Sequence, residues 1–241
     1  MNDGSNLLQA KGLTMRFGGV IAVDNVDFAV RYGELRCLIG PNGAGKSTFF
    51  KMLSGQLKPT SGDVLLKGNS IVGLPTARIA SLGVGIKTQV PSVFDGMTVR
   101  ESVHLAAGRT LTSLLARKRA TETLERMRIA HLEKRVVGEL AHGQRQIVEL
   151  AMVVAPQPDL ILLDEPAAGM TGDEVAHLAN VIVDLARSGA VIVVEHDMKF
   201  IRRIAKVVTV FSQGKVLSEG PVADVLADQR VRDVYLGREA T

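Results

Sequence analysis

The chain has 241 residues, of which 46% are hydrophobic and 22% charged, a composition typical of globular domains rather than disordered or fibrous chains. A formal net charge of +4 is too mild to indicate nucleic-acid binding, and 4% aromatic residues without tryptophan leave few side chains for base stacking, so charge alone identifies no partner. The single cysteine, Cys37, excludes an intramolecular disulfide and a multi-cysteine zinc site. No apolar run reaches the about 18 residues of a membrane span, and residues 1–12 lack the features of a secretory signal, so a cytoplasmic protein is predicted.

Two kinds of apolar pattern predict two kinds of strand. Residues 13–30 alternate apolar and polar side chains around a Gly-Gly turn, and residues 64–66 follow a second turn, so both regions are predicted to be antiparallel strands. The first residues of the chain are expected to be a frayed end. Continuous apolar runs predict parallel strands that are covered on both faces, at residues 35–39, 160–163 and 190–194.

Helical patterns separate these strands. Two capping boxes predict helix starts, at Thr98 with Glu101 and at Thr171 with Glu174. Residues 117–132 place charge on one side, residues 147–154 repeat apolar side chains at helical spacing, and the helix after Thr171 is expected to end near residue 188. Residues 221–236 predict a strand exit and one or two short helices. Strands alternating with helices indicate an α/β fold with its chemistry at the carboxyl ends of the parallel strands.

A glycine-rich loop follows the first apolar run and precedes a helix-compatible stretch at residues 48–53. Its sequence fits the phosphate-loop pattern G-x-x-x-x-G-K-[ST], in which backbone N–H groups and the positive end of the next helix cradle phosphates. Lys46 adds a positive charge and the Ser47 hydroxyl is a ligand for Mg²⁺. The alternative is a glycine-rich turn without a ligand. The predicted phosphate-binding residues are Gly40, Pro41, Asn42, Gly43, Ala44, Gly45, Lys46, Ser47 and Thr48.

Polar residues also follow the second and third apolar runs. Asp164 and Glu165 end one run, and we predict that Asp164 holds Mg²⁺ while Glu165 polarises the attacking water. An acidic turn after a core strand is the alternative. His196 follows the third run and is predicted to reach a γ-phosphate, although a lone histidine is more often structural. Cys37 and three histidines without a second ligand at metal spacing are predicted to be structural: His104, His131 and His177.

The order and spacing of these motifs resemble the ATP-binding subunit of ATP-binding cassette (ABC) transporters, over essentially the whole chain. Gln89 lies in the Q-loop position, residues 168–171 in the D-loop position and His196 in that of the switch histidine. The residues in the LSGGQ signature position are Leu140, Ala141, His142, Gly143 and Gln144.

The resemblance implies the fold of a P-loop NTPase and one domain over residues 1–241. It comprises an antiparallel β subdomain (residues 1–30 and 60–72), a RecA-like parallel-sheet core (31–59 and 156–241) and a helical signature subdomain (98–155).

The resemblance also implies the ligands and partners. ATP lies between the phosphate loop of one subunit and the signature helix of a second ABC ATPase subunit, identical or related. Phe17 stacks on adenine, and Ser47, Gln89 and Asp164 surround Mg²⁺. The chain is expected to sit peripherally on the cytoplasmic face of the inner membrane, beneath transmembrane permease subunits. A periplasmic or extracellular solute-binding protein completes the system, and no nucleic acid is involved.

Two departures from the family pattern bear on activity. Ala141 replaces the usual signature serine and His142 the next glycine, so a hydroxyl expected to contact the γ-phosphate is missing. Such a hydrogen bond is worth about 1.5–3 kcal/mol, which predicts slower hydrolysis rather than none. The residues around Gln89, including Lys87, also differ from the usual ones, and because this segment faces the membrane subunit they affect partner choice.

Three segments indicate a subfamily. Residues 168–171, 194–198 and 234–237 are similar to importers of hydrophobic amino acids and of urea or short amides. His142 and the Gly-Met-Thr run at residues 169–171 favour urea or an amide as the solute, with branched-chain amino acids as the alternative. Alternatives of another class are an ABC ATPase acting on DNA or ribosomes and a regulatory module that does not hydrolyse ATP.

Overall fold

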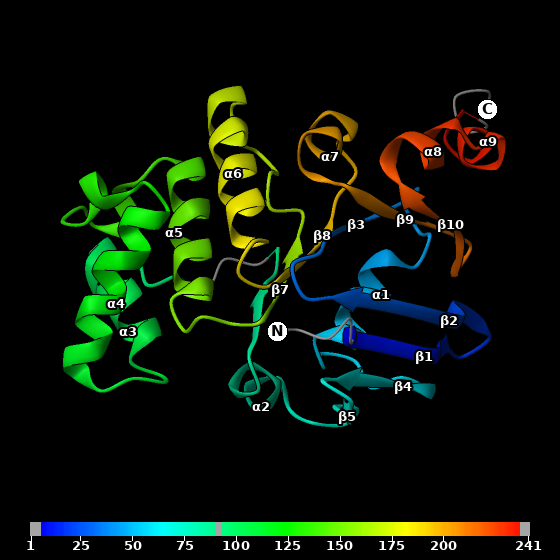
Figure 1. Cartoon of the computed structure of the whole chain (residues 1–241), viewed down its shortest axis with the longest axis horizontal. Coiled ribbons are helices and arrows are strands. Elements are labelled where there is room, and N and C mark those ends of the chain that lie inside the picture. The colour runs from blue at the N-terminus through cyan, green and yellow to red at the C-terminus, as the bar shows by residue number, and fades with distance from the viewer. Residues whose placement is uncertain (1–5, 90–92, 237–241) are drawn as a thin grey trace.

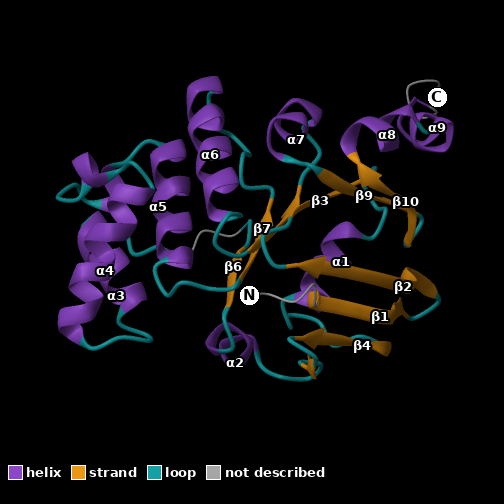
Figure 2. Ribbon diagram, viewed as in Figure 1, coloured by secondary structure: helices purple, strands orange, loops and turns teal. Residues whose placement is uncertain are grey.

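The computed structural model describes residues 6–89 and 93–236, which form two sheets and the helices around them (Figure 1). A four-stranded sheet has the order β2-β1-β4-β5, and a six-stranded sheet has the order β10-β9-β3-β8-β7-β6. Figure 2 shows the six-stranded sheet through the centre, with the smaller sheet on one side of it and most helices on the other. The structure therefore has the α/β class predicted from the sequence.

The small sheet is antiparallel, as predicted. It consists of β1 (Asn6–Phe17), β2 (Val20–Arg31), β4 (Ser61–Leu66) and β5 (Asn69–Ser70). Strand β1 begins at Asn6, before the predicted start of the antiparallel region at residue 13, and residues 1–5 of the predicted frayed end lie outside the described residues. Leu7 and Leu8 are completely buried, and Leu8 pairs with Leu66 of β4. This burial holds the beginning of β1 in the sheet.

The large sheet contains the three predicted parallel strands. They are β3 (Leu35–Ile39), β7 (Leu160–Asp164) and β8 (Ala190–Val194), and every residue in them is buried. Their neighbours β6 (Val84–Lys87) and β9 (Val207–Ser212) are also parallel, whereas the edge strand β10 (Lys215–Pro221) is antiparallel to β9. The carboxyl ends of β3, β6, β7 and β8 therefore lie along one edge of the sheet.

The helices follow the predicted capping signals more closely than the predicted ends. Both capping boxes are present, at Thr98 and Thr171. The predicted helix over residues 117–132 instead begins at Ser113 and ends at Arg126, before a short 3₁₀ turn. The helices are α1 (Lys46–Leu53), α2 (Thr76–Ser81), α3 (Val99–Ala107), α4 (Ser113–Arg126), α5 (His142–Val154), α6 (Gly172–Leu185), α7 (Met198–Ile204), α8 (Val222–Ala227) and α9 (Gln229–Leu236), with 3₁₀ turns at Ala130–Leu132 and Val137–Glu139.

The large sheet separates two hydrophobic clusters. On one face Cys37 packs with apolar residues of the helices from α3 onward, and on the other face Leu38 packs with α1 and the small sheet. Burial raises the pKa of the Cys37 thiol, which fits its predicted role as a core residue. Within residues 6–89 and 93–236, no helix is long and apolar enough to cross a membrane.

Candidate functional site

The glycine-rich loop runs from the end of β3 to the start of α1. Gly40 has φ +143° and Gly45 has φ +102°, in the region that favours glycine. A Cβ atom added to Gly40 would lie 2.2 Å from the carbonyl oxygen of Phe211, and one added to Gly45 would lie 2.4 Å from that of Ala22. These two glycines therefore allow the loop to fit between β2 and β9.

Lys46 lies inside this loop. Its Nζ atom donates hydrogen bonds to the carbonyl oxygens of Gly40 (2.6 Å) and Pro41 (2.9 Å), and the residue is 8% exposed. Ser47 on the first turn of α1 is exposed, as are Asn42 and Gly43 in the loop. The ammonium group is thus held beside the first-turn N–H groups of α1, an arrangement suited to a phosphate group.

Asp164 and Glu165 occupy the end of β7. Asp164 is 6% exposed, and its Oδ1 atom has no hydrogen-bond partner among the described residues. Burial, and then the neighbouring Glu165 carboxylate, raise the pKa of Asp164 to about 6. A buried carboxylate oxygen without a donor is a suitable ligand for a hard cation such as Mg²⁺. Among the described residues no group of three or more His, Cys, Asp or Glu could hold a metal, so a cation here would depend on hydroxyl, amide or phosphate oxygens as well.

Glu165 has an unusual backbone conformation. Its φ angle is +46°, and its N–H donates to the carbonyl oxygen of Val194 on β8 (3.0 Å). Its carboxylate is 30% exposed and lies 3.6 Å from Nδ1 of His196. The structure therefore brings together the glutamate that follows β7 and the histidine that follows β8.

Glu195 is a neighbour whose role the sequence did not reveal. It is 2% exposed, and its Oε2 atom accepts the N–H of His196 (2.9 Å) and lies 3.7 Å from Nδ1 of that residue. Its Oε1 atom accepts the N–H of Ala167 (3.4 Å). Glu195 thus links the loops that follow β7 and β8. An acidic residue directly after an apolar strand was the available signal.

The other predicted site residues lie on different elements. Phe17 ends β1, with 48% of its surface exposed, and Gln89 is exposed two residues after β6. The signature residues 140–144 begin α5, and Figure 1 shows α5 at one side of the molecule, apart from α1. The described chain therefore assembles residues 40–48, 164–165 and 196 into one site, while its signature residues lie on a different element, at the start of α5.

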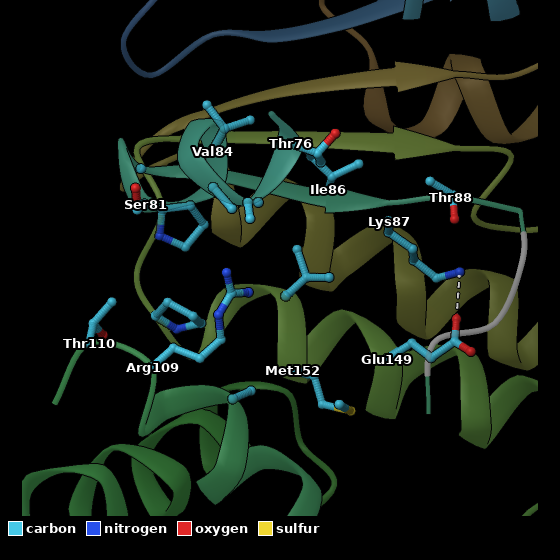
Figure 3. Close-up of a pocket in the computed structure, with 18 of the residues that line it drawn as sticks. Thr76, Ser81, Val84, Ile86, Lys87, Thr88, Arg109, Thr110, Glu149 and Met152 are labelled. Carbon is cyan, nitrogen blue, oxygen red and sulfur yellow. Dashed lines mark ion pairs between the residues drawn. The ribbon is translucent and has the colours of Figure 1, made fainter. Parts of the chain in front are cut away.

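A cavity of about 580 Å³ lies next to β6 rather than at the phosphate loop. Its lining comes from α2, β6, α3 and α5 and includes Phe94 and Leu105. Figure 3 shows Ile86, Arg109 and Met152 among the lining residues. Lys87 and Glu149 form an ion pair on its wall, with Nζ and Oε2 3.0 Å apart and both side chains almost fully buried. Oε1 of Glu149 has no hydrogen-bond partner among the described residues. This pair connects the strand before Gln89 to the signature helix.

Comparison with known proteins agrees with this geometry. The family model described as "ABC transporter" matches residues 23–168, and one described as "Branched-chain amino acid ATP-binding cassette transporter" matches residues 215–241. The chain is 36% identical over 249 aligned residues to LivG of Salmonella typhimurium, a "High-affinity branched-chain amino acid transport ATP-binding protein", with 96% of this chain and 98% of LivG covered. It is 32% identical to the "Lipopolysaccharide export system ATP-binding protein LptB" of Haemophilus influenzae, with 97% and 98% covered.

A solved structure supports the fold independently. The ADP conformation of MJ1267, an ATP-binding cassette of an ABC transporter, matches with a TM-score of 0.87 and 26% identity, covering 97% of this chain and 99% of MJ1267. The similarity thus extends over both sheets and the helices between them.

Proposed function

The chain belongs to the ABC transporter ATP-binding family, whose members bind and hydrolyse ATP to drive transport, and we propose that it energises the import of branched-chain amino acids. The match at residues 215–241 to a model specific for branched-chain amino acid transporters carries this choice. Whole-chain identity separates solutes poorly, because LptB, named for lipopolysaccharide export, is nearly as similar as LivG. Urea or a short amide, the solute favoured by the signature and D-loop residues, is now the second candidate.

In the proposed mechanism the phosphate loop binds ATP. Its backbone N–H groups and the start of α1 face the β- and γ-phosphates, and Lys46 neutralises part of their charge. Ser47, Gln89 and Asp164 would hold Mg²⁺, which when bound offsets charge on the phosphate oxygens. The unpartnered, buried Oδ1 atom of Asp164 supports this role.

Glu165 and His196 would act on the reacting atoms. Glu165 orients a water and accepts its proton as the water oxygen attacks the γ-phosphorus, and the bond to the β-phosphate oxygen breaks to leave ADP. His196 contacts the γ-phosphate from the same side. The 3.6 Å between His196 Nδ1 and Glu165 Oε1 supports a joint action at one phosphate.

The remaining expectations concern partners. A second ABC ATPase subunit would add its signature residues 140–144 to the ATP bound here, and Phe17, which is exposed, would stack on adenine. The cavity beside β6 would receive a segment of a transmembrane permease, because it adjoins Gln89 and carries exposed apolar residues such as Phe94 and Leu105. A solute-binding protein would deliver the amino acid, and the chain would sit peripherally on the cytoplasmic face of the inner membrane.

Uptake of labelled leucine and labelled urea, measured in cells that lack this chain, tests the proposal. We expect leucine uptake to be lost and to return with the native chain but not with Glu165→Gln. If urea uptake behaved in this way instead, the transported solute would be urea or a short amide, the second candidate. Loss of neither would contradict both choices of solute.

A further inference from the structure

We propose that His142 is a positioning residue for Glu165 of its own subunit, acting through the backbone of Ala168. The inference rests on the proposed role of Glu165 and deepens it. The signature position suggests that His142 contacts nucleotide, but the structure directs its ring toward the loop that follows β7.

The first link is a hydrogen bond between two distant segments. Nε2 of His142, at the start of α5, lies 3.1 Å from the carbonyl oxygen of Ala168. A carbonyl oxygen only accepts hydrogen bonds, so this contact requires the proton on Nε2. The ring also lies against Gly169, where an added Cβ would be 3.1 Å from Nε2. Gly169 has φ +72°, so both its conformation and this contact favour glycine there.

The second link runs from Ala168 to Glu165. The N–H of Ala168 donates to the carbonyl oxygen of Glu165 (3.3 Å), while the N–H of Glu165 donates to Val194 (3.0 Å). A non-glycine residue at φ +46° is costly and persists only when its surroundings hold it. Ala168 is therefore one of the groups that keep the Glu165 backbone, and with it the carboxylate, in its orientation.

Neighbouring contacts also hold the backbone of His142 in place. Gly143 packs so closely on Glu174 that an added Cβ would lie 2.1 Å from the Glu174 carboxyl carbon. The same carboxylate accepts the N–H (2.8 Å) and the hydroxyl (2.9 Å) of Thr171 at the start of α6. The first turn of α5 is thus held against the cap of α6, and His142 can restrain Ala168 from a fixed point.

Steady-state ATP hydrolysis by the purified protein tests the role in catalysis. We expect His142→Leu to lower kcat about three- to tenfold, the effect of one hydrogen bond, and to change KM for ATP less than about twofold. His142→Gln should restore most of the rate, because its terminal amide places an N–H donor near the position of Nε2. His131→Leu, a substitution at an exposed histidine on a 3₁₀ turn, is the matched control and should leave kcat unchanged.

Coupling to Glu165 is tested by a double-mutant cycle in single-turnover experiments. If His142 acts through Glu165, His142→Leu should have almost no effect on the residual rate of a Glu165→Gln protein. An equal reduction in the native and the Glu165→Gln backgrounds would overturn the proposal, because the histidine would then act independently of that carboxylate.

Hydrogen exchange of the nucleotide-free protein tests the contact without any ATPase assay. The Ala168 amide should exchange about three to ten times faster in His142→Leu but not in His142→Gln or His131→Leu. Unchanged exchange in His142→Leu would overturn the proposal. An inactive native chain with accelerated exchange in His142→Leu would instead refute the proposed function and the catalytic role of the histidine, while establishing the contact.

Discussion

The strand ends that carry residues 40–48, 164–165 and 196 are built differently from the helical region α3–α5 that carries residues 140–144. At the strand ends, functional side chains follow strands that are buried along their whole length. In the helical region, the position of the signature residues depends on contacts between segments that are distant in sequence, such as Lys87 with Glu149 and Gly143 with Glu174. Short motifs therefore specify the first region almost alone, whereas the second needs pairs of residues that no local pattern reveals.

The largest expected effect lies at the strand ends. Glu165→Gln removes the proposed base while keeping the size of the side chain, so turnover should fall about 100- to 10,000-fold with little change in ATP affinity. Phosphate release and equilibrium ATP binding measure the two quantities. Turnover within about threefold of the native value would exclude Glu165 as the base and would move the chemistry away from β7.

The sequence alone predicts the strand-end region well. Residues 35–39, 160–163 and 190–194 are continuously apolar because both faces of each strand are covered, and the structure confirms them as β3, β7 and β8. The carboxylate and histidine that follow β7 and β8 then meet because parallel strands end at the same edge. The first residues of β1 were missed because tertiary contacts order them, through pairing with both β2 and β4.

The helical region α3–α5 and the strand β6 that packs against it were harder to predict. Strand β6 is short, contains Gly85 and ends in a charged residue, so its sequence lacks the pattern of a buried strand. The structure explains both features: a Cβ on Gly85 would lie 2.8 Å from Val153 of α5, and Lys87 is neutralised by Glu149. Neither reason can be inferred from spacing along the chain.

The second prediction tests whether paired contacts stabilise the helical region. Glu149→Leu leaves the Lys87 ammonium buried without its partner, and the free energy of unfolding should fall by about 3–5 kcal/mol. Lys87→Met should have a similar cost, whereas the double variant should be close to the native protein, because no buried charge is left unpaired. Urea denaturation measures all three.

Lys118→Met is the control for that series. It removes a lysine of the exposed pair Lys118–Glu122, in which the side chains are 76% and 50% exposed, so we expect a loss below about 1 kcal/mol. If Lys87→Met cost no more than this control, the cavity wall would tolerate a lone carboxylate. The helical region would then not depend on this buried ion pair for its stability.

The third prediction uses the buried carboxyl group at the end of β7. The pKa of Asp164 is about 6 in the folded chain against an ordinary 3.8, so between these values the folded state binds more protons than the unfolded state. Without nucleotide or metal, the contribution of Asp164 to stability is greatest below pH 4 and is lost as the pH rises through 6. Asp164→Asn should therefore raise the free energy of unfolding by about 2–3 kcal/mol relative to the native chain at pH 7.

Denaturation with urea in a chelator, at pH 4 and at pH 7, measures this difference. The asparagine variant should gain stability relative to the native chain only at the higher pH, and it should bind Mg²⁺ with ATP more weakly. An advantage of equal size at both pH values would show that the carboxyl group does not titrate in this range. The strand-end site would then be less desolvated than its burial indicates.

The smallest expected effect concerns Ala141, the N-cap residue of α5. A serine there could cap the exposed N–H groups of the first turn and, in a closed dimer, donate its hydroxyl to the γ-phosphate. Such a bond is worth about 1.5–3 kcal/mol. Solvent exposure and opening of the dimer reduce the stabilisation of the transition state below that value, so Ala141→Ser should raise kcat about three- to tenfold. Phosphate release by the assembled transporter measures it.

The outcome separates two explanations of the departure at the signature position. If kcat rises while thermal stability increases by the modest amount expected of an N-cap, about 1 kcal/mol, the missing hydroxyl limits turnover. If stability rises and kcat does not, the serine caps α5 without reaching phosphate, since His142 and Gly143 already fix this turn against the D-loop and α6. Catalysis would then be controlled at the strand ends alone, and the helical region would contribute position rather than a reacting group.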